Sequence, residues 1–481
     1  MMEWVDIRLG DACTKIGSGA TPRGGGSVYL DEGPIAFIRS QNVYNEGFSK
    51  DGMVYLDEKL AQGLANVQVV ELDVLLNITG DSVARACQVK KEVLPARVNQ
   101  HVAIIRTDQE KLWPTYLRYF LVSPAMQAHM LGLAAVGATR NALTKGMIES
   151  FSIRCPKKID DQKAIAKILS SLDDKIDLNR RINQTLEAMA QAIFKSWFVD
   201  FDPVKAKIAA IEQGEDPLRA AMRAISGKTD SELDQMPREH HDQLAATAAL
   251  FPDAMEESES GEIPKGWNSV PFGCLLSHTI GGDWGTEAPD TVNDARVAII
   301  RGTDIPDLDQ AQISRVPIRY TNKKKLATRR LQVGDIVLEV SGGSKDQPTG
   351  RSFHMTSNAL REFDCPVEPA SFCRLLRPVS LEVGVVLSLH LSYIYQQGKT
   401  WEYQNQSTGI ANFQTAHFLE AELVVTPPNS VLEVFFAMVS PILERRHDAQ
   451  GRKLALTRDT LLPKLMSGEL SVSCPLNEDA Q

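Results

Sequence analysis

The stretch Leu72-Asp73-Val74-Leu75-Leu76-Asn77-Ile78-Thr79-Gly80 recurs later in the chain as Gly334-Asp335-Ile336-Val337-Leu338-Glu339-Val340-Ser341-Gly342. Both copies place an apolar run between an aspartate and a glycine, the pattern of a buried strand that ends in a turn. The recurrence indicates that the fold is set by one strand-rich unit that occurs twice.

Further matches on both sides of this stretch follow in the same order. They are Trp4–Gly10 with Trp267–Gly273, Ile35–Arg39 with Val297–Arg301, Arg140–Thr144 with Ala411–Thr415, and Pro156 with Pro427. The offset is about 262 residues early and about 271 late, far longer than the period of a solenoid repeat. We therefore predict a duplicated domain and a pseudo-two-fold protein that recognises something in two pieces.

Each copy is predicted to be an α/β (α+β) domain, over residues 1–157 and 263–428. Short strand-like runs at Ile35–Arg39, Asp73–Ile78 and His101–Arg106 are separated by glycine-rich and polar loops. One helical stretch, Trp113–Leu133, comes late in the first copy, and Leu381–Gln397 is its counterpart.

Residues 158–201 change to a helical pattern with apolar residues at three- and four-residue steps. A heptad fits with a at 165, 172, 179, 186 and 193 and d at 168, 175, 182, 189 and 196, leaving Asn179, Lys175 and Ser196 as polar exceptions. This predicts a coiled-coil seam in a rod of about 60 Å, since about 40 residues rise roughly 1.5 Å each. Such a helix needs a partner helix.

Residues 429–470 supply a second, less regular apolar stripe, which we expect Pro441, Gly451 and Pro463 to kink or interrupt. The two helices are predicted to pair, separating the duplicated domains. The alternative is that each helix packs only on its own domain. Between them, residues 202–262 form an acidic connector with a short helix over Glu215–Gly227 and a polar linker over Met255–Gly261; residues 471–481 are a tail.

The composition favours a soluble intracellular protein. With 481 residues and 43% hydrophobic content the chain has room for two or three domains with real cores. We see no signal peptide and no apolar run near the roughly 18 residues that span a bilayer, so we expect a cytoplasmic protein of a bacterium or archaeon. The seven scattered cysteines lack metal-ligand spacing and are expected to be reduced thiols.

The net charge of −9 does not exclude a nucleic-acid partner. Residues 205–259 hold 12 acidic and 6 basic side chains, or −6, so the rest of the chain carries only −3. Basic clusters such as Lys323–Lys325 stand outside this acidic segment. An acidic body can present a basic surface locally.

Sequence motifs of catalysis are missing. There is no GxxxxGK[ST], GxGxxG, HExxH or GxSxG pattern and no Asn-Pro-Pro-Tyr tetrad, and His240-His241 has no third ligand nearby. We therefore expect a protein that is not an enzyme and binds no metal.

The chain instead carries polar side chains just after predicted strands, at similar depths in both copies. Arg, Asn and Gln pair with base edges, whereas Lys, Ser and Thr serve phosphates. The DNA-binding candidates are Arg39, Gln41, Asn42, Asn99, Gln100, Thr139, Arg140 and Asn141 in the first copy, and Arg301, Thr303, Lys345, Gln347, Arg351, Gln404, Asn405 and Asn412 in the second.

Several longer motifs resemble the specificity (S) subunit of Type I restriction–modification systems across essentially the whole chain. They are Asp161–Ile176, Asn179–Glu187, Ser196–Phe201, Gly261–Trp267 and Leu461–Leu470. One departure is that the second helical region lacks the Gln-Lys-x-Ile-Ala opening of the first.

This resemblance implies two target recognition domains, each contacting one half of a split DNA sequence from the major groove. Two long antiparallel helices would hold them apart and dock two methyltransferase subunits, with Phe194, Trp197, Phe198, Leu461 and Leu462 as partner-binding candidates. Two restriction subunits could join. S-adenosylmethionine, ATP and Mg would sit on those partners, and this chain would bind no cofactor.

Two alternatives stay open at this point. One is a stand-alone bipartite DNA-binding protein without a methylase partner. The other is an enzyme with its own nuclease or methyltransferase centre, which the missing motifs disfavour.

Overall fold

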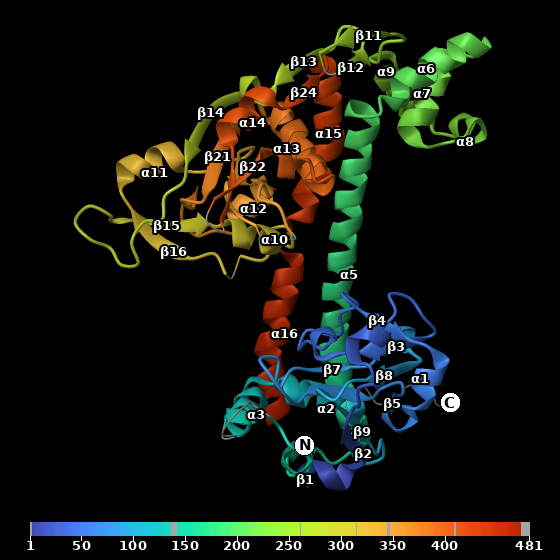
Figure 1. Ribbon diagram of the computed structural model, residues 1–481, viewed down its shortest axis with the longest axis vertical. Coiled ribbons are helices and arrows are strands. Elements are labelled where there is room, and N and C mark those ends of the chain that lie inside the picture. Colours follow the sequence, from blue (N-terminus) through green and yellow to red (C-terminus); the bar gives the residue numbers. More distant parts are fainter. Residues whose placement is uncertain are drawn as a thin grey trace. The chain divides into compact units, whose positions relative to one another are not determined.

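The computed structural model describes residues 2–135, 142–259, 261–313, 315–343, 347–407 and 410–472. It divides into two compact units, the first formed by Met1–Asp177 with Lys453–Gln481 and the second by Leu178–Arg452 (Figure 1). Each unit combines an α/β lobe with two packed helical segments, so the predicted α/β class is confirmed.

The lobe of the first unit contains two four-stranded sheets. One has the order β2 (Cys13–Ser18), β9 (Val102–Thr107), β6 (Val74–Asn77), β7 (Ala86–Gln88), and the other β4 (Val54–Leu56), β3 (Ile35–Ile38), β8 (Ala96–Val98), β5 (Gln68–Val69). A separate pair, β1 (Trp4–Arg8) and β10 (Ser152–Pro156), brings the two ends of the lobe together.

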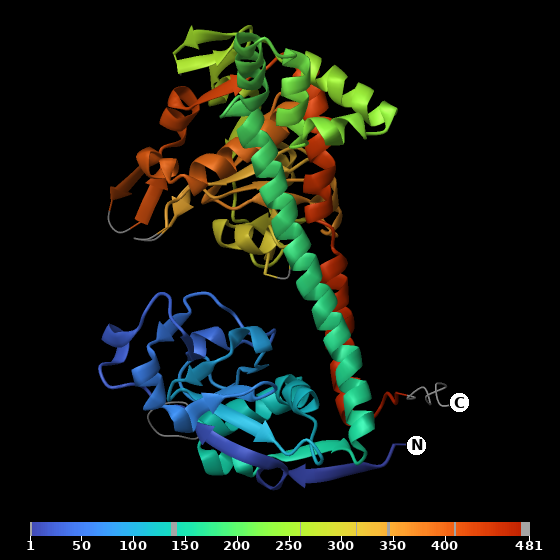
Figure 2. The same cartoon turned by 90° about the vertical axis from the view of Figure 1, so that its right-hand side faces the viewer.

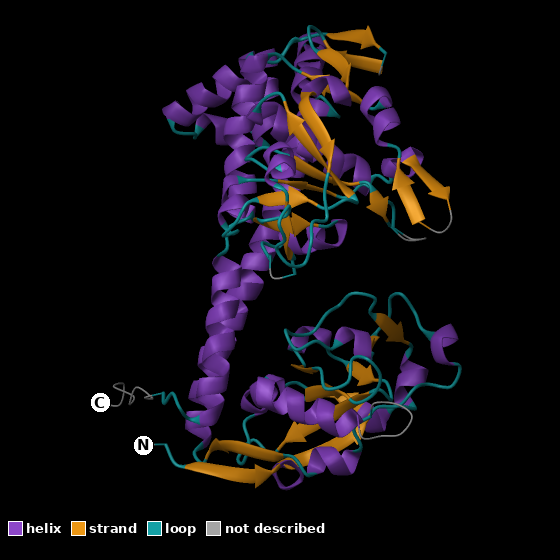
Figure 3. Cartoon of the chain, turned by 90° about the vertical axis from the view of Figure 1, so that its left-hand side faces the viewer, coloured by secondary structure: helices purple, strands orange, loops and turns teal. Residues whose placement is uncertain are grey.

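The lobe of the second unit repeats the four-strand order of the first sheet, and its second sheet has three strands with no counterpart of β5 among the described residues. One sheet runs β14 (Leu276–Gly281), β21 (Cys373–Pro378), β17 (Ile336–Glu339), β19 (Ser352–His354); another runs β16 (Ile318–Thr321), β15 (Ala295–Ile300), β20 (Val367–Pro369). The pair β13 (Asn268–Pro271) and β24 (Leu423–Thr426) matches β1 and β10. This lobe adds a small sheet of β18 (Ser341–Gly342), β23 (Ile410–Phe413) and β22 (Gln404–Ser407) (Figure 3).

An identical buried ion pair marks the two copies. Asp73 accepts from the Nε and guanidinium of Arg106 at 2.8 Å each, and Asp335 accepts from those of Arg377 at 2.8 and 2.7 Å. Each carboxylate also caps its own turn. Because both aspartates are nearly inaccessible, the pair fixes the start of β6 and β17 in the same way in each lobe.

The helical stretch expected over Trp113–Leu133 is two helices, α2 (Pro114–Val122) and α3 (Pro124–Ala135). Ser123 between them is extended because Pro124 disfavours helical geometry in the residue before it. The counterpart α13 (Leu381–Gln396) has no internal proline and is continuous.

Long helices close the core of each unit. Helix α5 (Ile159–Phe198) has 40 residues; the second stripe forms α15 (Asn429–Arg446) and α16 (Gln450–Ser467). In the first unit Ile165 and Leu169 of α5 share a core with Leu465 of α16. In the second, Trp197 of α5 shares a core with Phe435 of α15, and α5 lies beside the partner helix in both views (Figures 1 and 2).

The expected heptad register of α5 is wrong at its d positions. Lys175, Ile182 and Met189, placed at d, are exposed, whereas the buried side chains Ile176, Ala190 and Trp197 stand one position later. Lys175 and Ser196, which are polar at predicted d positions, already indicated that the buried positions lie one residue later.

The interruption of the second stripe is also displaced. Pro441 and Pro463 lie inside α15 and α16, and the chain leaves the helix at His447–Ala449. There Asp448 accepts from the backbone N–H of Gln450, and buried His447 contacts Thr356. Capping and a tertiary contact set the break, not the prolines.

The connector is folded against the second unit. It forms α6 (Asp202–Gln213), α7 (Pro217–Ser226), α8 (Asp230–Asp234) and α9 (Arg238–Ala249), with α7 where a short helix was expected. The predicted linker is instead a hairpin of β11 (Met255–Ser258) and β12 (Gly261–Pro264). The ring centroids of Phe201 and Phe251 lie 6.0 and 6.2 Å from that of Trp267. Among the described helices none is long and apolar enough to cross a membrane.

Candidate nucleic-acid interface

A one-turn 3₁₀ helix, η3 (Ser40–Asn42), follows β3 in the first lobe, and Asn42 holds it together. The Asn42 Oδ1 accepts from the Arg39 backbone N–H at 3.0 Å, and its Nδ2 donates to the carbonyls of Ser49 and Asp51 at 3.1 Å each. The side chain is fully buried. Asn42 is therefore a turn-forming residue, and the prediction that it contacts DNA is corrected.

Arg39 and Gln41 stand at the edge of the same turn. The Arg39 guanidinium donates to the Gly52 carbonyl at 2.5 Å and lies 5.8 Å from the ring centroid of Tyr29. Its buried Nε has no hydrogen-bond partner among the described residues. Gln41 is exposed and donates to the same carbonyl at 3.3 Å. Both candidates are thus brought together.

A second polar group of the first lobe follows β8. Asn99 is largely buried, and its Oδ1 accepts from the His101 backbone N–H at 3.1 Å. His101 Nδ1 lies 2.6 Å from Thr79 Oγ1, and its Nε2 lies 3.2 Å from Nε2 of exposed Gln100. Gln100 is therefore the accessible member, while Asn99 shapes the loop. Thr139, Arg140 and Asn141 lie outside the described residues.

The second lobe repeats the turn as η7 (Gly302–Asp304) after β15, with a charged cap. The Asp304 carboxylate accepts from the Arg301 backbone N–H and Nε at 2.9 Å each and from its terminal nitrogen at 2.6 Å. These bonds raise the pKa of Arg301 above its ordinary value. Arg301 is thus paired and oriented within its own turn, and Thr303 beside it is exposed.

Beneath this turn lies a second charge pair. Arg351 donates to Glu339 at 2.9 and 2.5 Å, and the Glu339 side chain is almost fully buried. A Cβ on Gly302 would come within 2.3 Å of Glu339 Oε1, so only glycine allows the turn to approach this carboxylate. Arg351 is therefore a support for the turn.

A cavity of about 630 Å³ opens above these pairs. Four predicted residues, Arg301, Thr303, Gln347 and Arg351, line it together. Lys345 lies outside the described residues. Two aromatic lining residues, Trp284 and Phe372, were missed from the sequence; Phe372 follows β20 as His101 follows β8, and that position could have identified it.

The added hairpin aligns two more candidates. Asn405 and Asn412 are directly opposite in β22 and β23, and Asn412 is opposite Ser341 of β18. Both asparagines are exposed, which gives a polar row across this small sheet. Gln404 instead accepts from the Thr349 backbone N–H at 3.1 Å and braces the neighbouring loop.

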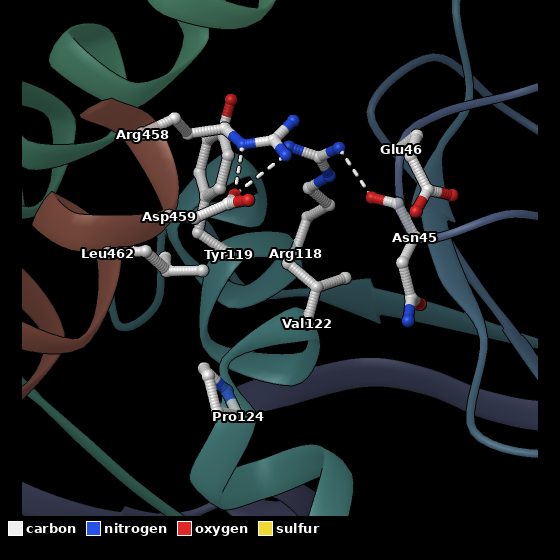
Figure 4. Close-up of a pocket in the computed structure, with 9 residues that line it drawn as sticks. All are labelled: Asn45, Glu46, Arg118, Tyr119, Val122, Pro124, Arg458, Asp459 and Leu462. Carbon is white, nitrogen blue, oxygen red and sulfur yellow. Dashed lines mark hydrogen bonds and ion pairs between the residues drawn. The ribbon is translucent and has the colours of Figure 1, made fainter. Parts of the chain in front are cut away.

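A charged junction fixes the first lobe to its helices, and Figure 4 shows its two arginines, Arg118 and Arg458, beside Tyr119. Asp173 of α5 accepts from Arg118 of α2 at 2.6 Å, from Arg458 of α16 at 2.8 Å and from the Tyr119 hydroxyl at 2.6 Å. Arg118 also donates to the backbone carbonyl of Asn45, three residues beyond η3. We call Arg118, Asp173 and Arg458 the first junction. Burial opposes ionisation of Asp173, but the two arginines and Tyr119 outweigh it and lower its pKa.

The corresponding place in the second lobe has a single cation. Arg446 of α15 forms ion pairs with Glu187 of α5 at 2.5 Å and with Asp309, just after α10 (Ile305–Leu308), at 3.1 Å. We call Arg446, Glu187 and Asp309 the second junction. A cavity of about 50 Å³ adjoins it, lined also by His354 and His447. Burial raises the pKa of Asp309 to about 6, partly offset by Arg446, and lowers that of His354 to about 4.

Comparisons with known proteins agree with this arrangement. Residues 1–188 match the family described as the Type I restriction modification DNA specificity domain. The chain is 28% identical over 494 aligned residues to the Type I restriction enzyme HindI specificity subunit of Haemophilus influenzae, covering 98% of this chain and 100% of that one.

Two further proteins support the specificity-subunit resemblance. The Type I restriction enzyme MjaIX specificity subunit of Methanocaldococcus jannaschii is 23% identical, over 74% of this chain and 69% of its own. The fold resembles that of a Type I restriction–modification S subunit from M. genitalium, with a TM-score of 0.52, 13% identity and coverage of 96% of each chain.

The helix residues expected to bind partners are mostly internal. Phe194, Trp197 and Phe198 are buried, with Phe198 4.7 Å from the ring centroid of Phe435 and Trp197 4.9 Å from that of Phe251. Leu462 is buried in the first unit and Leu461 packs against the same core. The prediction of exposed partner sites at these positions is wrong, because each unit uses them to hold its own helices. Within the described residues no cluster of three His, Cys, Asp or Glu could hold a metal.

Proposed function

We propose that the chain is the non-catalytic DNA-recognition subunit of a Type I restriction–modification complex, and that each lobe recognises one half of a bipartite target. The observation that carries the proposal is the repeated turn after β3 and β15. In both lobes a buried cap orients an arginine and leaves a polar side chain, Gln41 or Thr303, exposed at the lobe edge. The names of the relatives point the same way.

The exposed polar groups suit direct contact with base edges. Gln41 and Gln100 in the first lobe, and Gln347, Asn405 and Asn412 in the second, are exposed amide side chains of the kind that pair bidentately with adenine. Arg39 and Arg301 offer guanidinium donors that suit guanine or phosphate. Asn42, Asn99, Arg351 and Gln404 act on DNA only through the loops that they hold.

The helices are proposed to set the spacer between half-sites and to dock two methyltransferase subunits. Two restriction subunits would join the full complex. S-adenosylmethionine, ATP and Mg would belong to those partners, in the cytoplasm of the host. Support for docking comes from α5, where Leu178 and Met189 are 49% and 48% exposed. Large apolar side chains at that exposure favour a protein partner.

The deciding experiment is co-expression with the methyltransferase subunit encoded beside this chain, followed by mapping of methyladenine in the host DNA. A split motif with a fixed non-specific gap is the expected result. A soluble complex without new methylation, paired with specific DNA binding by the chain alone, would favour the stand-alone DNA-binding protein. The absence of both new methylation and specific DNA binding would refute the proposal.

Single substitutions then assign the halves. Arg301→Ala should relax one motif position, whereas a uniform loss across sequences would indicate a phosphate contact. Arg296 is the matched control, since it is an arginine at the other end of β15, paired with Asp364. Arg296→Ala should leave the motif unchanged.

The spacer hypothesis has its own test. Four residues inserted after Asp177 in α5, with four after Arg452 in α16, add about one helical turn, roughly 5.4 Å, to both helices. The gap in the methylated motif should grow by about two base pairs. An unchanged gap would show that the helices do not determine it.

A further inference from the structure

Phe372 is an exposed aromatic side chain on a fixed backbone. It lies between β20 and β21 and is 67% exposed. Its carbonyl accepts from the backbone N–H groups of Val340 and Ser341 at 2.9 and 3.3 Å, and Cys373 donates to Ala370 at 2.8 Å. The exposure is therefore built into the sheet end and does not arise from a loose loop.

The surroundings of Phe372 combine one more aromatic ring with polar groups. Trp284 lines the same cavity at 39% exposure, and the Arg319 guanidinium lies 4.7 Å from its ring centroid. Thr303, Ser341 and Gln347 line the cavity as well. An apolar wall thus stands directly beside the polar side chains that the proposed function assigns to base contacts.

The first lobe uses a different residue at this place. One glycine in each lobe lies against two successive backbone carbonyls. A Cβ on Gly19 would lie 2.1 Å from the carbonyl oxygen of Val98 and 2.2 Å from that of Asn99. A Cβ on Gly282 would lie at the same distances from the carbonyl oxygens of Pro369 and Ala370. Asn99 therefore corresponds to Ala370, and His101 corresponds to Phe372. His101 is hydrogen-bonded to Thr79, whereas Phe372 can offer only apolar contact.

The chemistry of base edges limits what such a ring can recognise. In the major groove, amino and carbonyl groups line every base pair, and an apolar ring pressed against them would remove water without replacing its hydrogen bonds. The only apolar group there is the C5-methyl of thymine, which 5-methylcytosine shares. A ring among base-contacting side chains gains only at that methyl.

We propose that Phe372 recognises the C5-methyl group of a pyrimidine in the half-site contacted by the second lobe. The inference rests on the proposed function and deepens it. It makes Phe372 a specificity-determining residue, with Trp284 as the second apolar wall of the same cavity.

The test uses the complex with its methyltransferase subunits and the mapped target. Thr303→Ala and Gln347→Ala first identify the half-site of the second lobe by the motif positions that they relax. Each thymine of that half-site is then replaced singly by deoxyuridine, which removes only the methyl group. One replacement should weaken binding by about fourfold or more, the effect of exposing one buried methyl-sized group. If instead 5-methylation of one cytosine strengthens binding, the source of the methyl is 5-methylcytosine.

Variants separate this contact from a general loss. Phe372→Ala should bind thymine and deoxyuridine duplexes equally, Phe372→Leu should keep part of the difference, and His101→Ala in the first lobe should keep all of it. Circular dichroism checks that the exposed substitution leaves the fold intact. The proposal is overturned if no position responds to the methyl group, if Phe372→Ala keeps the full response, or if 2-aminopurine fluorescence shows a methyl-independent wedge between bases. Failure of the proposed function is distinct, since no specific binding would then occur at either half.

Discussion

The two units fix their lobes to their helices with opposite charges. In the first junction one carboxylate, Asp173, lies between two arginines. In the second junction one arginine, Arg446, lies between two carboxylates. Both junctions reach the segment just beyond the candidate recognition turn, at Asn45 or Asp309. Both junctions therefore join a lobe to its helices near the recognition turn, but the central residue is a carboxylate in the first and an arginine in the second.

This difference makes the lobes unequal in two respects. A lobe placed against the other unit's helices would leave a buried charge without its partner, so each lobe is matched to its own helix pair. The second junction also adjoins two histidines, whereas none lines the pocket at the first. The units should therefore respond differently to substitution and to pH.

The largest effect is expected from Asp173→Asn. Removing the carboxylate leaves Arg118 and Arg458 facing each other, with the Arg118 side chain only 8% exposed. Loss of one partner from a buried ion pair typically costs about 3–5 kcal/mol, and urea unfolding should show a loss of that size in the first unit. Asp459→Asn is the control, because its contact with Arg458 is exposed and should be worth under about 1 kcal/mol. Equal effects of the two variants would show that the first junction does not hold the lobe.

A smaller loss, about 2 kcal/mol, is expected for Arg446→Met in the second junction, since Glu187 and Asp309 are only partly buried. Without the arginine, the pKa of Asp309, already about 6, should rise further, because Arg446 now lowers it. Protonation would then relieve the repulsion from Glu187. The variant should accordingly be less destabilised at pH 5.5 than at pH 7.5 in urea unfolding, while exposed Arg445→Met should show little change at either pH. A loss independent of pH would contradict this account.

Acidification alone should loosen the second junction before the first. Burial, with Arg446, lowers the pKa of His354 to about 4 and that of His447 well below its usual value, so the unfolded chain binds their protons more readily. Their stabilising contribution is lost as pH falls below about 6.5. The raised pKa of Asp309, about 6, has the opposite effect on stability. Its protonation favours the folded chain as the pH falls, and this offsets the loss from one histidine. Asp173, with a lowered pKa, loses its contribution only below about pH 4.

Hydrogen exchange between pH 7.5 and 5.5, corrected for intrinsic rates, can follow both junctions at once. Protection in α13 and β19 should fall by more than that in α2. His447→Gln should reduce the fall, and His240→Gln, in the exposed connector, should not. A parallel decline in both units would rule out a role for the histidines.

The sequence predicted the duplicated lobes well because strand periodicity and the paired aspartates Asp73 and Asp335 are local signals. It failed where one residue type serves two purposes. Asparagine recognises adenine but also caps turns, so Asn42 was assigned to DNA although it is buried in its own turn. Phe372 was missed because an aromatic residue is usually taken as core, and only its place after β20 shows that it is exposed. The seam of α5 was misplaced because its buried face is determined by the lobes as well as by the partner helices.

The smallest effect concerns the two turns, which differ in a single cap. Asp304→Asn would give the second turn the neutral cap that Asn42 provides in the first, and the amide oxygen can still accept from the Arg301 backbone N–H. Stability should change by less than about 1 kcal/mol. The Arg301 charge would no longer be neutralised within the turn, so the slope of log affinity against log salt should steepen by about one unit if a phosphate is contacted. An unchanged slope would mean that Arg301 does not reach the DNA backbone, leaving base contact as its purpose.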